Sequence, residues 1–363
     1  MHPLPLRHSL ANQMADILRQ EIERGGWKDW LPGERALCAK YQVSRNTLRA
    51  ALEQLKRAGV IEARHGTGNR ILTSASPPAP RLRSRDVALL SPEPLERLRP
   101  TQTLWIDELR AMLSERGCRL HVFYGRQYFR ANPGRALQRL IADNPHGCWI
   151  LTLSNVAIQR WFAKHEVACV VAGSVHAGLE LPSRDLDHRA MCRHAAGVLL
   201  GLGHRKLALM ITKSQLAGDL ESEAGFLEGV RKSSHEGAEA VVVRHDGSVD
   251  GISRALRWLM ESTPPPTALL VGNPFHYLTV SSRLVQMGRQ IPRDVSVVSR
   301  DDDSFLSFVL PEPARYASNP HPFATSLLRP VLELLQGHPP AEKSSRLIPR
   351  FLRGESLGAP GAD

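Results

Sequence analysis

A short stretch near the N-terminus carries side chains suited to DNA contacts, at Ser44, Arg45, Asn46, Thr47 and Arg49. Arginine can hold a guanine base through two hydrogen bonds, and such a pair discriminates against a wrong base by roughly 1–3 kcal/mol. Serine and threonine hydroxyls suit phosphate oxygens, as does the N-terminus of a helix. The spacing therefore predicts the first turn of a helix presented to a major groove.

Two helices and a turn are expected to position these side chains. Residues 34–41 predict a short first helix, and Gln42-Val43 forms the turn. Ser44 is a suitable N-cap for a second helix over residues 45–58, which Gly59 would end. A preceding helix is expected over residues 8–24, where apolar residues recur at helical spacing.

A basic, glycine-rich hairpin follows the second helix. Residues 60–63 and 69–72 predict two short strands, and the tip between them contains Arg64, His65, Gly66 and Thr67. Glycine lets such a tip approach a nucleic-acid backbone closely. The alternative is a small helical domain with a solvated basic face. The helix pair and hairpin together favour DNA binding over that alternative.

The charge balance points in the same direction. The chain has 363 residues, a formal net charge of +11 and a pI near 9.8. Residues 1–74 hold twelve lysines and arginines against seven acidic residues. This excess favours a polyanionic partner, although an arginine-rich proteome would give the same pI.

From residue 86 onward, strand-like segments alternate with helical ones, for example residues 87–90, 119–124, 148–153 and 268–271 among the strands. This order predicts an α/β domain with parallel sheets covered on both faces. About 270 residues exceed one ordinary sheet, so two lobes are expected. The Ser/Pro-rich residues 74–85 predict a linker between this domain and the N-terminal one.

Catalytic, metal-binding and membrane signatures are missing from the sequence. No nucleophile elbow, phosphate-binding loop or zinc-protease motif occurs, and the five cysteines have no metal-ligand spacing. No signal peptide or membrane-length apolar run is present. We expect a cytoplasmic protein that is not an enzyme and that has no cofactor and no metal.

A small-molecule pocket in such a fold is built by loops at the carboxyl ends of the strands, where two lobes face each other. Seven residues are candidates for it: Ser91, Ser154, Asn155, Ser174, Asn273, His276 and Arg300. Each signal is individually weak, since a serine after a strand is more often a helix cap.

The N-terminal segment LPGERALCAKYQVSRNTLRAALEQLKRAGVIEARHGTGNRI resembles the winged helix-turn-helix of the GntR family of bacterial transcription regulators. Gly33 stands where that family usually has serine. The resemblance implies that Arg35, Ser44, Arg45, Thr47 and Arg49 contact phosphates and bases. It also implies that His65 and Gly66 reach the minor groove from the wing.

Residues 86–352 resemble the effector domain of LacI/GalR regulators, which has the periplasmic sugar-binding-protein fold. Three segments carry the likeness: residues 186–211, PPPTALLVGNP at 264–274 and IPRDVSVVSRDDD at 291–303. Two ligand-gripping positions of sugar-binding relatives fall on Ser222 and Pro274, and the position before the Asp-Asp pair is Arg300. An ordinary sugar is therefore disfavoured. Arg300 would favour an acidic ligand, unless it faces solvent or pairs with Asp301 or Asp303.

Together these features predict a DNA-binding domain at residues 1–73, a linker, an effector and dimerisation domain at 86–352 and a disordered tail at 353–363. Lobe 1 would hold about 86–186 and 301–317, and lobe 2 about 187–300 and 318–352. We expect a homodimeric regulator on a pseudo-palindromic double-stranded DNA operator, controlled by a small molecule. The resemblance implies a repressor. One alternative is a body that only dimerises; another, an aminotransferase-like body, is disfavoured because this one is too short.

Overall fold

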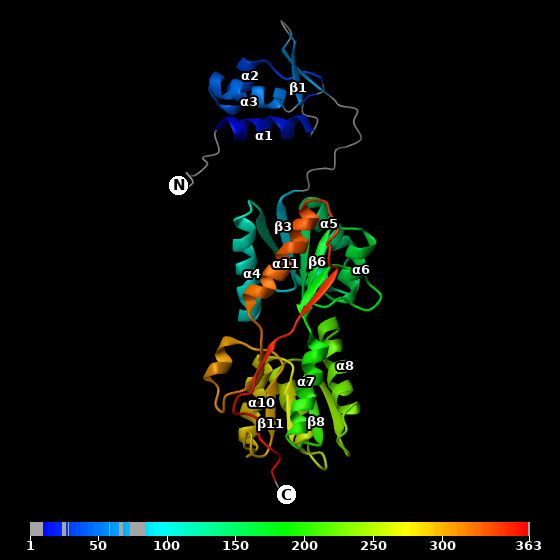
Figure 1. The fold of residues 1–363 in the computed structure, drawn as a ribbon. Coiled ribbons are helices and arrows are strands. Elements are labelled where there is room, and N and C mark those ends of the chain that lie inside the picture. The colour runs from blue at the N-terminus through cyan, green and yellow to red at the C-terminus, as the bar shows by residue number, and fades with distance from the viewer. Residues whose placement is uncertain are drawn as a thin grey trace. The chain divides into compact units, whose positions relative to one another are not determined.

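The computed structural model describes residues 10–23, 27, 29–57, 59–64, 68–72 and 84–361. The chain divides into two compact units, Met1–Arg81 and Leu82–Asp363, each with its own hydrophobic core (Figure 1). The boundary falls within the predicted linker, of which residues 74–83 lie outside the described part.

The N-terminal unit consists of three helices and a hairpin: α1 (Leu10–Glu23), α2 (Glu34–Tyr41), α3 (Arg45–Arg57), β1 (Ile61–Arg64) and β2 (Gly68–Ile71). Apolar side chains recur on one face of α3, and these pack with Leu18 of α1 and Leu37 of α2. Ile61 pairs with Ile71 across the hairpin, and both are buried in the same core. The unit is therefore a helix-turn-helix followed by a hairpin wing, as the sequence predicts.

The second unit contains two six-stranded sheets, one in each lobe. The lobe 1 sheet has the order β13-β7-β6-β5-β3-β4, with β3 (Asp86–Ser91), β4 (Arg119–Tyr124), β5 (Cys148–Thr152), β6 (Cys169–Ala172), β7 (Ser183–Leu186) and β13 (Ser344–Leu347). The lobe 2 sheet has the order β14-β12-β11-β10-β8-β9, with β8 (Lys206–Thr212), β9 (Glu239–His245), β10 (Ala268–Val271), β11 (Ser296–Ser299), β12 (Ala314–Ala317) and β14 (Arg350–Leu352). All pairs are parallel except β12 with β14.

Helices cover both faces of each sheet. In lobe 1, α4 (Pro100–Ser114) and α11 (Pro320–Leu335) pack on one face, and α5 (Gly134–Asp143) and α6 (Val156–Lys164) on the other. In lobe 2, the corresponding pairs are α7 (His188–Gly201) with α8 (Ala217–Arg231), and α9 (Val249–Met260) with α10 (Pro274–Gln286). Three short 3₁₀ helices complete the unit: η1 (Leu95–Arg97), η2 (Arg126–Phe129) and η3 (Ser304–Phe308). Because both faces are covered, the central strands are continuous apolar runs, which made them predictable.

The structure corrects the predicted assignment of residues 301–352 to the lobes. β12 pairs with β11 and belongs to lobe 2, whereas the sequence predicts residues 301–317 in lobe 1. α11 then returns to lobe 1, where its apolar face packs beside α4, and β13 pairs with β7 there (Figure 1). Of residues 318–352, β14 is the strand that pairs in lobe 2. The predicted order was wrong because the apolar face of α11 is buried only by completing the lobe 1 core.

The predicted disordered tail is also corrected, since residues 353–361 pack on lobe 2. Ser356 is fully buried, and its hydroxyl donates to the Val297 carbonyl and accepts from the Ala314 amide. The Gly358 carbonyl lies 3.0 Å from His204 Nε2, and its amide donates to Ser296. The tail is ordered because it satisfies backbone groups of β11 and β12 that would otherwise be buried without partners.

Candidate functional site

A cavity of about 170 Å³ lies between the two lobes of the second unit. Its walls come from loops at the carboxyl ends of β5 and β6, from the starts of α4 and α8, and from the residues after β11. Trp105 and Phe323 contribute an aromatic wall, with ring centroids 5.3 Å apart in an edge-on arrangement. Leu153, Leu216 and Pro320 add apolar surface. This is the place where α/β folds of two facing lobes bind small molecules.

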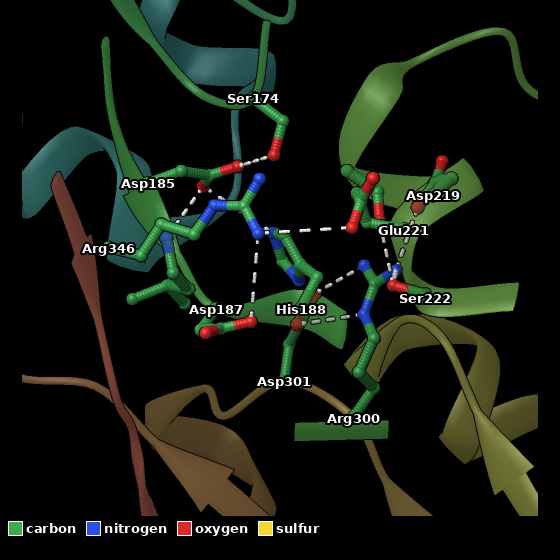
Figure 2. Close-up of polar contacts among 12 residues, drawn as sticks. Ser174, Asp185, Asp187, His188, Asp219, Glu221, Ser222, Arg300, Asp301 and Arg346 are labelled. Carbon is green, nitrogen blue, oxygen red and sulfur yellow. Dashed lines mark hydrogen bonds and ion pairs between the residues drawn. The ribbon is translucent and has the colours of Figure 1, made fainter. Parts of the chain in front are cut away.

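Arg300, directly after β11, is the central charge of the cavity (Figure 2). Its guanidinium donates to both carboxylate oxygens of Asp301, at 3.1 and 3.0 Å, and to Asp219 Oδ1 at 2.7 Å. Burial alone would lower the pKa of Arg300, but the two aspartates raise it well above the ordinary value. The residue is 7% exposed and is therefore a buried, fully paired cation.

A fourth hydrogen bond of Arg300 goes to Ser222, the position where the resemblance implies a ligand-binding arginine. Arg300 Nη1 donates to Ser222 Oγ at 3.0 Å, and Ser222 is the position on α8 where the resemblance to LacI/GalR regulators places that arginine. A guanidinium therefore still reaches this position, but it comes from the end of β11 and is held by the chain's own acids. Of the partners that the sequence suggested for Arg300, the structure shows Asp301. The second partner is Asp219 and not Asp303.

Ion pairs join the two lobes around the cavity. Arg99, which precedes α4 in lobe 1, donates to Asp301 Oδ2 of lobe 2 at 2.6 Å. Arg346 of β13 lies 3.8 Å from Glu221 of α8 (Figure 2). Burial would raise the pKa of Asp301, but Arg300 and Arg99 hold it well below the usual range. Asp301 is therefore ionised and binds an arginine from each lobe.

A second polar group crosses the lobes at Asp185 and His188. Asp185 of β7 accepts hydrogen bonds from the Ser174 hydroxyl and the Leu186 amide, and its Oδ1 lies 3.4 Å from His188 Nε2. Burial would raise the pKa of Asp185, but His188 and Ser174 hold it below the ordinary value. His188 Nδ1 is buried and has no hydrogen-bond partner among the residues that the structure describes. Both side chains line the cavity.

In the N-terminal unit, the predicted groove-facing side chains lie at the start of α3. Ser44 Oγ accepts a hydrogen bond from the Thr47 amide at 3.1 Å and lies 2.8 Å from the Thr47 hydroxyl, so Ser44 caps the helix as expected. Arg35, Arg45 and Asn46 are exposed. Arg49 is also exposed, but Glu34 of α2 holds its Nε at 3.0 and 3.3 Å.

Most of the predicted wing residues lie outside the residues that the structure describes. Arg64 ends β1, and His65, Gly66 and Thr67 lie outside the described residues. Their DNA contacts remain predictions. The strands on either side pair in register, with Arg64 opposite Gly68.

Each of the two units matches a family model over part of its length. A family model for bacterial regulatory proteins of the gntR family matches residues 10–71, and a model for a periplasmic binding protein-like domain matches residues 196–357. The chain joins a GntR-family domain to a periplasmic-binding-protein-like domain. The solved structure of a LacI family transcriptional regulator from Enterococcus faecium with bound ribose aligns over 76% of this chain and 99% of its own, with a TM-score of 0.59 and 17% identity. A CelR–cellobiose complex aligns over 97% of this chain and 100% of its own, with a TM-score of 0.66 and 20% identity.

Curated relatives of this chain are transcription regulators by name. Catabolite control protein A of Priestia megaterium is 21% identical over 53% of this chain and 54% of its own length. The HTH-type transcriptional repressor CytR of Escherichia coli (strain K12) is 21% identical over 46% of this chain and 49% of its own. The chain thus spans about half the length of the curated relatives it matches, and no enzyme family is indicated among them.

The periplasmic-binding-protein-like domain brings three of the seven predicted effector residues to its cavity: Ser154, Ser174 and Arg300. The other four lie elsewhere. Asn155 and Asn273 cap α6 and α10, and the Ser91 hydroxyl donates to the Glu93 carbonyl. His276 is half-buried and packs against His245, with ring centroids 4.8 Å apart. Capping took precedence at the asparagines, as it commonly does after a strand.

The sequence analysis missed the residues that line the cavity from less regular segments. Asp185 lies on a strand with too little apolar character to be predicted, and Arg99 lies just before the first residue of α4. Asp219 stands in the first turn of α8. An acidic residue in a helix's first turn is a usable signal, although it indicates a helix start and not a ligand.

Proposed function

We propose that this chain is a sequence-specific DNA-binding transcription regulator whose DNA affinity responds to a small molecule bound between the lobes. The observation that carries the proposal is the combination of a GntR-family domain with exposed basic residues on α3 and a body with a cavity between two lobes. Relatives named as transcriptional regulators and repressors support it. Such a protein works in the cytoplasm and needs no catalytic residue.

The DNA contact would be made by α3. Arg45 and Asn46 are exposed in its first turn, and Arg49 follows one turn later on the same side of the helix. Arg35 on α2 and the wing would bind phosphates and the minor groove. A dimer would place two such helices on half-sites about one helical turn apart, which requires a pseudo-palindromic operator.

An apolar face of lobe 2 supports the proposed homodimer. Phe275 of α10 stacks on Phe305 of η3, with centroids 4.9 Å apart, and Phe308 and Leu310 just beyond are each 88% exposed. A group of exposed apolar side chains of this kind suits an association site. The double variant Phe308→Ser and Leu310→Ser should shift the protein to monomer in sedimentation experiments. Leu220→Ser, which alters an exposed leucine on α8, is the matched control.

A body without a ligand is the second candidate, and a specific observation favours it. Arg300 occupies part of the inter-lobe space and donates four hydrogen bonds to Asp301, Asp219 and Ser222. The chain's own charges thus fill positions that a ligand would use. The remaining cavity of about 170 Å³, with its aromatic wall, favours the effector-controlled regulator over this candidate.

The test is DNA binding by the full chain with and without candidate effectors. Operator fragments would be selected from random DNA, and binding would be followed by fluorescence anisotropy. An effector should change the affinity by roughly 5- to 150-fold, the range of a typical coupling free energy. Selection of no sequence would reject the regulator. Selection of an operator whose affinity no metabolite mixture alters would favour the scaffold.

A further inference from the structure

The cavity between the lobes contains more carboxylates than guanidinium groups, although the chain as a whole is strongly basic. Two arginines, Arg99 and Arg300, line it against three aspartates, Asp185, Asp219 and Asp301, and His188 lies beside Asp185. The whole chain carries +11. A concave site of one sign with apolar walls concentrates ligands of the opposite sign. The charge of the cavity is thus informative about its ligand.

The cations of the cavity are already engaged. Arg300 donates hydrogen bonds to Asp301, Asp219 and Ser222, and Arg99 donates one through Nη1 to Asp301. Removing Arg300 from these partners to bind an acid would leave Asp219 without a cation and Asp301 with Arg99 alone, which is unfavourable. A carboxylate or phosphate ligand would therefore have to share Arg99 or Arg300 with aspartates that these arginines already bind.

The acceptors, by contrast, are only partly engaged. Asp219 uses Oδ1 for Arg300, and its Oδ2 accepts no hydrogen bond from any residue in the described part of the chain. Asp185 Oδ2 lies close to Gly218 at the start of α8. His188 Nδ1 is buried without a described partner. Figure 2 shows Asp219 on α8 across from Asp185, with His188 between them.

The remaining walls suit a flat apolar group. Trp105 and Phe323 form one side, with Leu153, Leu216 and Pro320 beside them. The volume of about 170 Å³ compares with the roughly 150 Å³ engineered cavity that accommodates benzene. Aromatic faces also attract cations that lie over them.

We propose that the effector is a small organic cation, in which an ammonium or amidinium group binds Asp219 Oδ2 and an apolar ring packs on Trp105 and Phe323. The inference rests on the proposed function and specifies the class of its ligand. The ammonium makes charge-assisted hydrogen bonds to an acceptor that has no competing cation on that oxygen. Neutral ligands of the same shape gain only the apolar contacts.

The experiment uses the full chain and two matched probe series. Benzylamine, benzyl alcohol and benzoate share one ring and differ in charge; glucosamine, glucose and glucuronate do the same on a sugar ring. Melting temperature and calorimetric titration are measured at neutral pH and constant ionic strength. Benzylamine should bind most tightly of the six, about tenfold more tightly than benzyl alcohol, and benzoate least within its series.

Variants at Asp219 make the assignment specific. Asp219→Asn keeps the shape and removes the charge, and should bring benzylamine to the affinity of benzyl alcohol. Asp219→Glu keeps the charge and should retain the preference for the amine. Asp250→Asn is the matched control, because Asp250 is likewise in the first turn of a lobe 2 helix, exposed and away from the cavity.

The results separate this inference from the proposed function. Benzoate or glucose binding as tightly as its amine, no response to any amine, or an unchanged benzylamine affinity in Asp219→Asn would each overturn the cationic class. Operator binding without ligand is measured in parallel. If operator binding persists while the amine preference fails, the regulator stands and only the ligand class is rejected.

Discussion

Arginines in the two units of this protein have opposite surroundings. Arg45 at the start of α3 is exposed, and no ion pair to it is described in the part of the chain that the structure covers. Arg300 in the inter-lobe cavity is 7% exposed and binds two aspartates and a serine. The same side chain is available to phosphates and bases in one unit, and is a fixed part of the wall in the other. Arginine content therefore indicates a polyanion only where the guanidinium is free.

The largest effect should come from breaking the buried network. Arg300→Met leaves Asp219 without a cation and Asp301 with Arg99 alone, so the free energy of unfolding of the second unit should fall by about 3–5 kcal/mol. Urea unfolding of the full chain measures it. Arg293→Met, at an exposed arginine of the same lobe, should change stability by less than about 0.5 kcal/mol. Equal effects at both positions would remove the distinction.

In the N-terminal unit, the corresponding substitution should affect binding and not folding. Arg45→Ala should weaken operator binding by roughly 1–3 kcal/mol and relax the preference at one base pair. Thermal stability should stay close to that of the unaltered protein, because the Arg45 side chain is exposed. Anisotropy titrations with single-base operator variants measure this. A variant that keeps the full preference would show that Arg45 reads no base.

The comparison extends to pH through the buried histidines of lobe 2. Burial, and then His245, lower the pKa of His276 to about 4, against about 6.5 in an unfolded chain. As pH falls below about 6.5, His276 becomes protonated in the unfolded chain but stays neutral in the folded protein. Stability is therefore lost between about pH 6.5 and 4, by about 1.4 kcal/mol per pH unit for this group.

His276→Asn should remove that part of the pH dependence. Comparing unfolding free energies at pH 7.5 and 5.0 should give a drop smaller by roughly 1–2 kcal/mol than in the unaltered protein. His338→Asn, at an exposed histidine, should leave the drop unchanged. His204 and His245, whose pKa values burial also lowers, would account for the remaining slope.

The smallest effect concerns the exposed ion pair between Glu34 and Arg49. Glu34→Ala should cost less than about 1 kcal/mol of stability, because both side chains are largely exposed. It should nevertheless lower base discrimination, because Arg49 then loses the partner that orients its guanidinium. The ratio of operator to random-DNA affinity is the readout. An unchanged ratio would assign Arg49 to phosphate contacts.

Much of the fold followed from the sequence because the signals were local. The helix-turn-helix and its wing were predictable, since their caps, turns and apolar periods lie within about 60 residues. The apolar strands β3, β5, β8 and β10 were predictable because sheets covered on both faces require continuous apolar runs. The strands that join or edge the lobes were not, since β7, β12 and β13 each contain an arginine within four residues.

The sequence by itself determined the type of each unit and the residues at the start of the DNA-facing helix. Only the tertiary structure decided the composition of the cavity. Arg300 meets Asp219 across 81 positions of sequence, and Asp301 meets Arg99 across 202. No periodicity or spacing in the sequence indicates such pairs, because the partners come together only when the two lobes have folded and face each other. A lone arginine after a strand suggested an acidic ligand, and its partners turned that suggestion toward a cationic one.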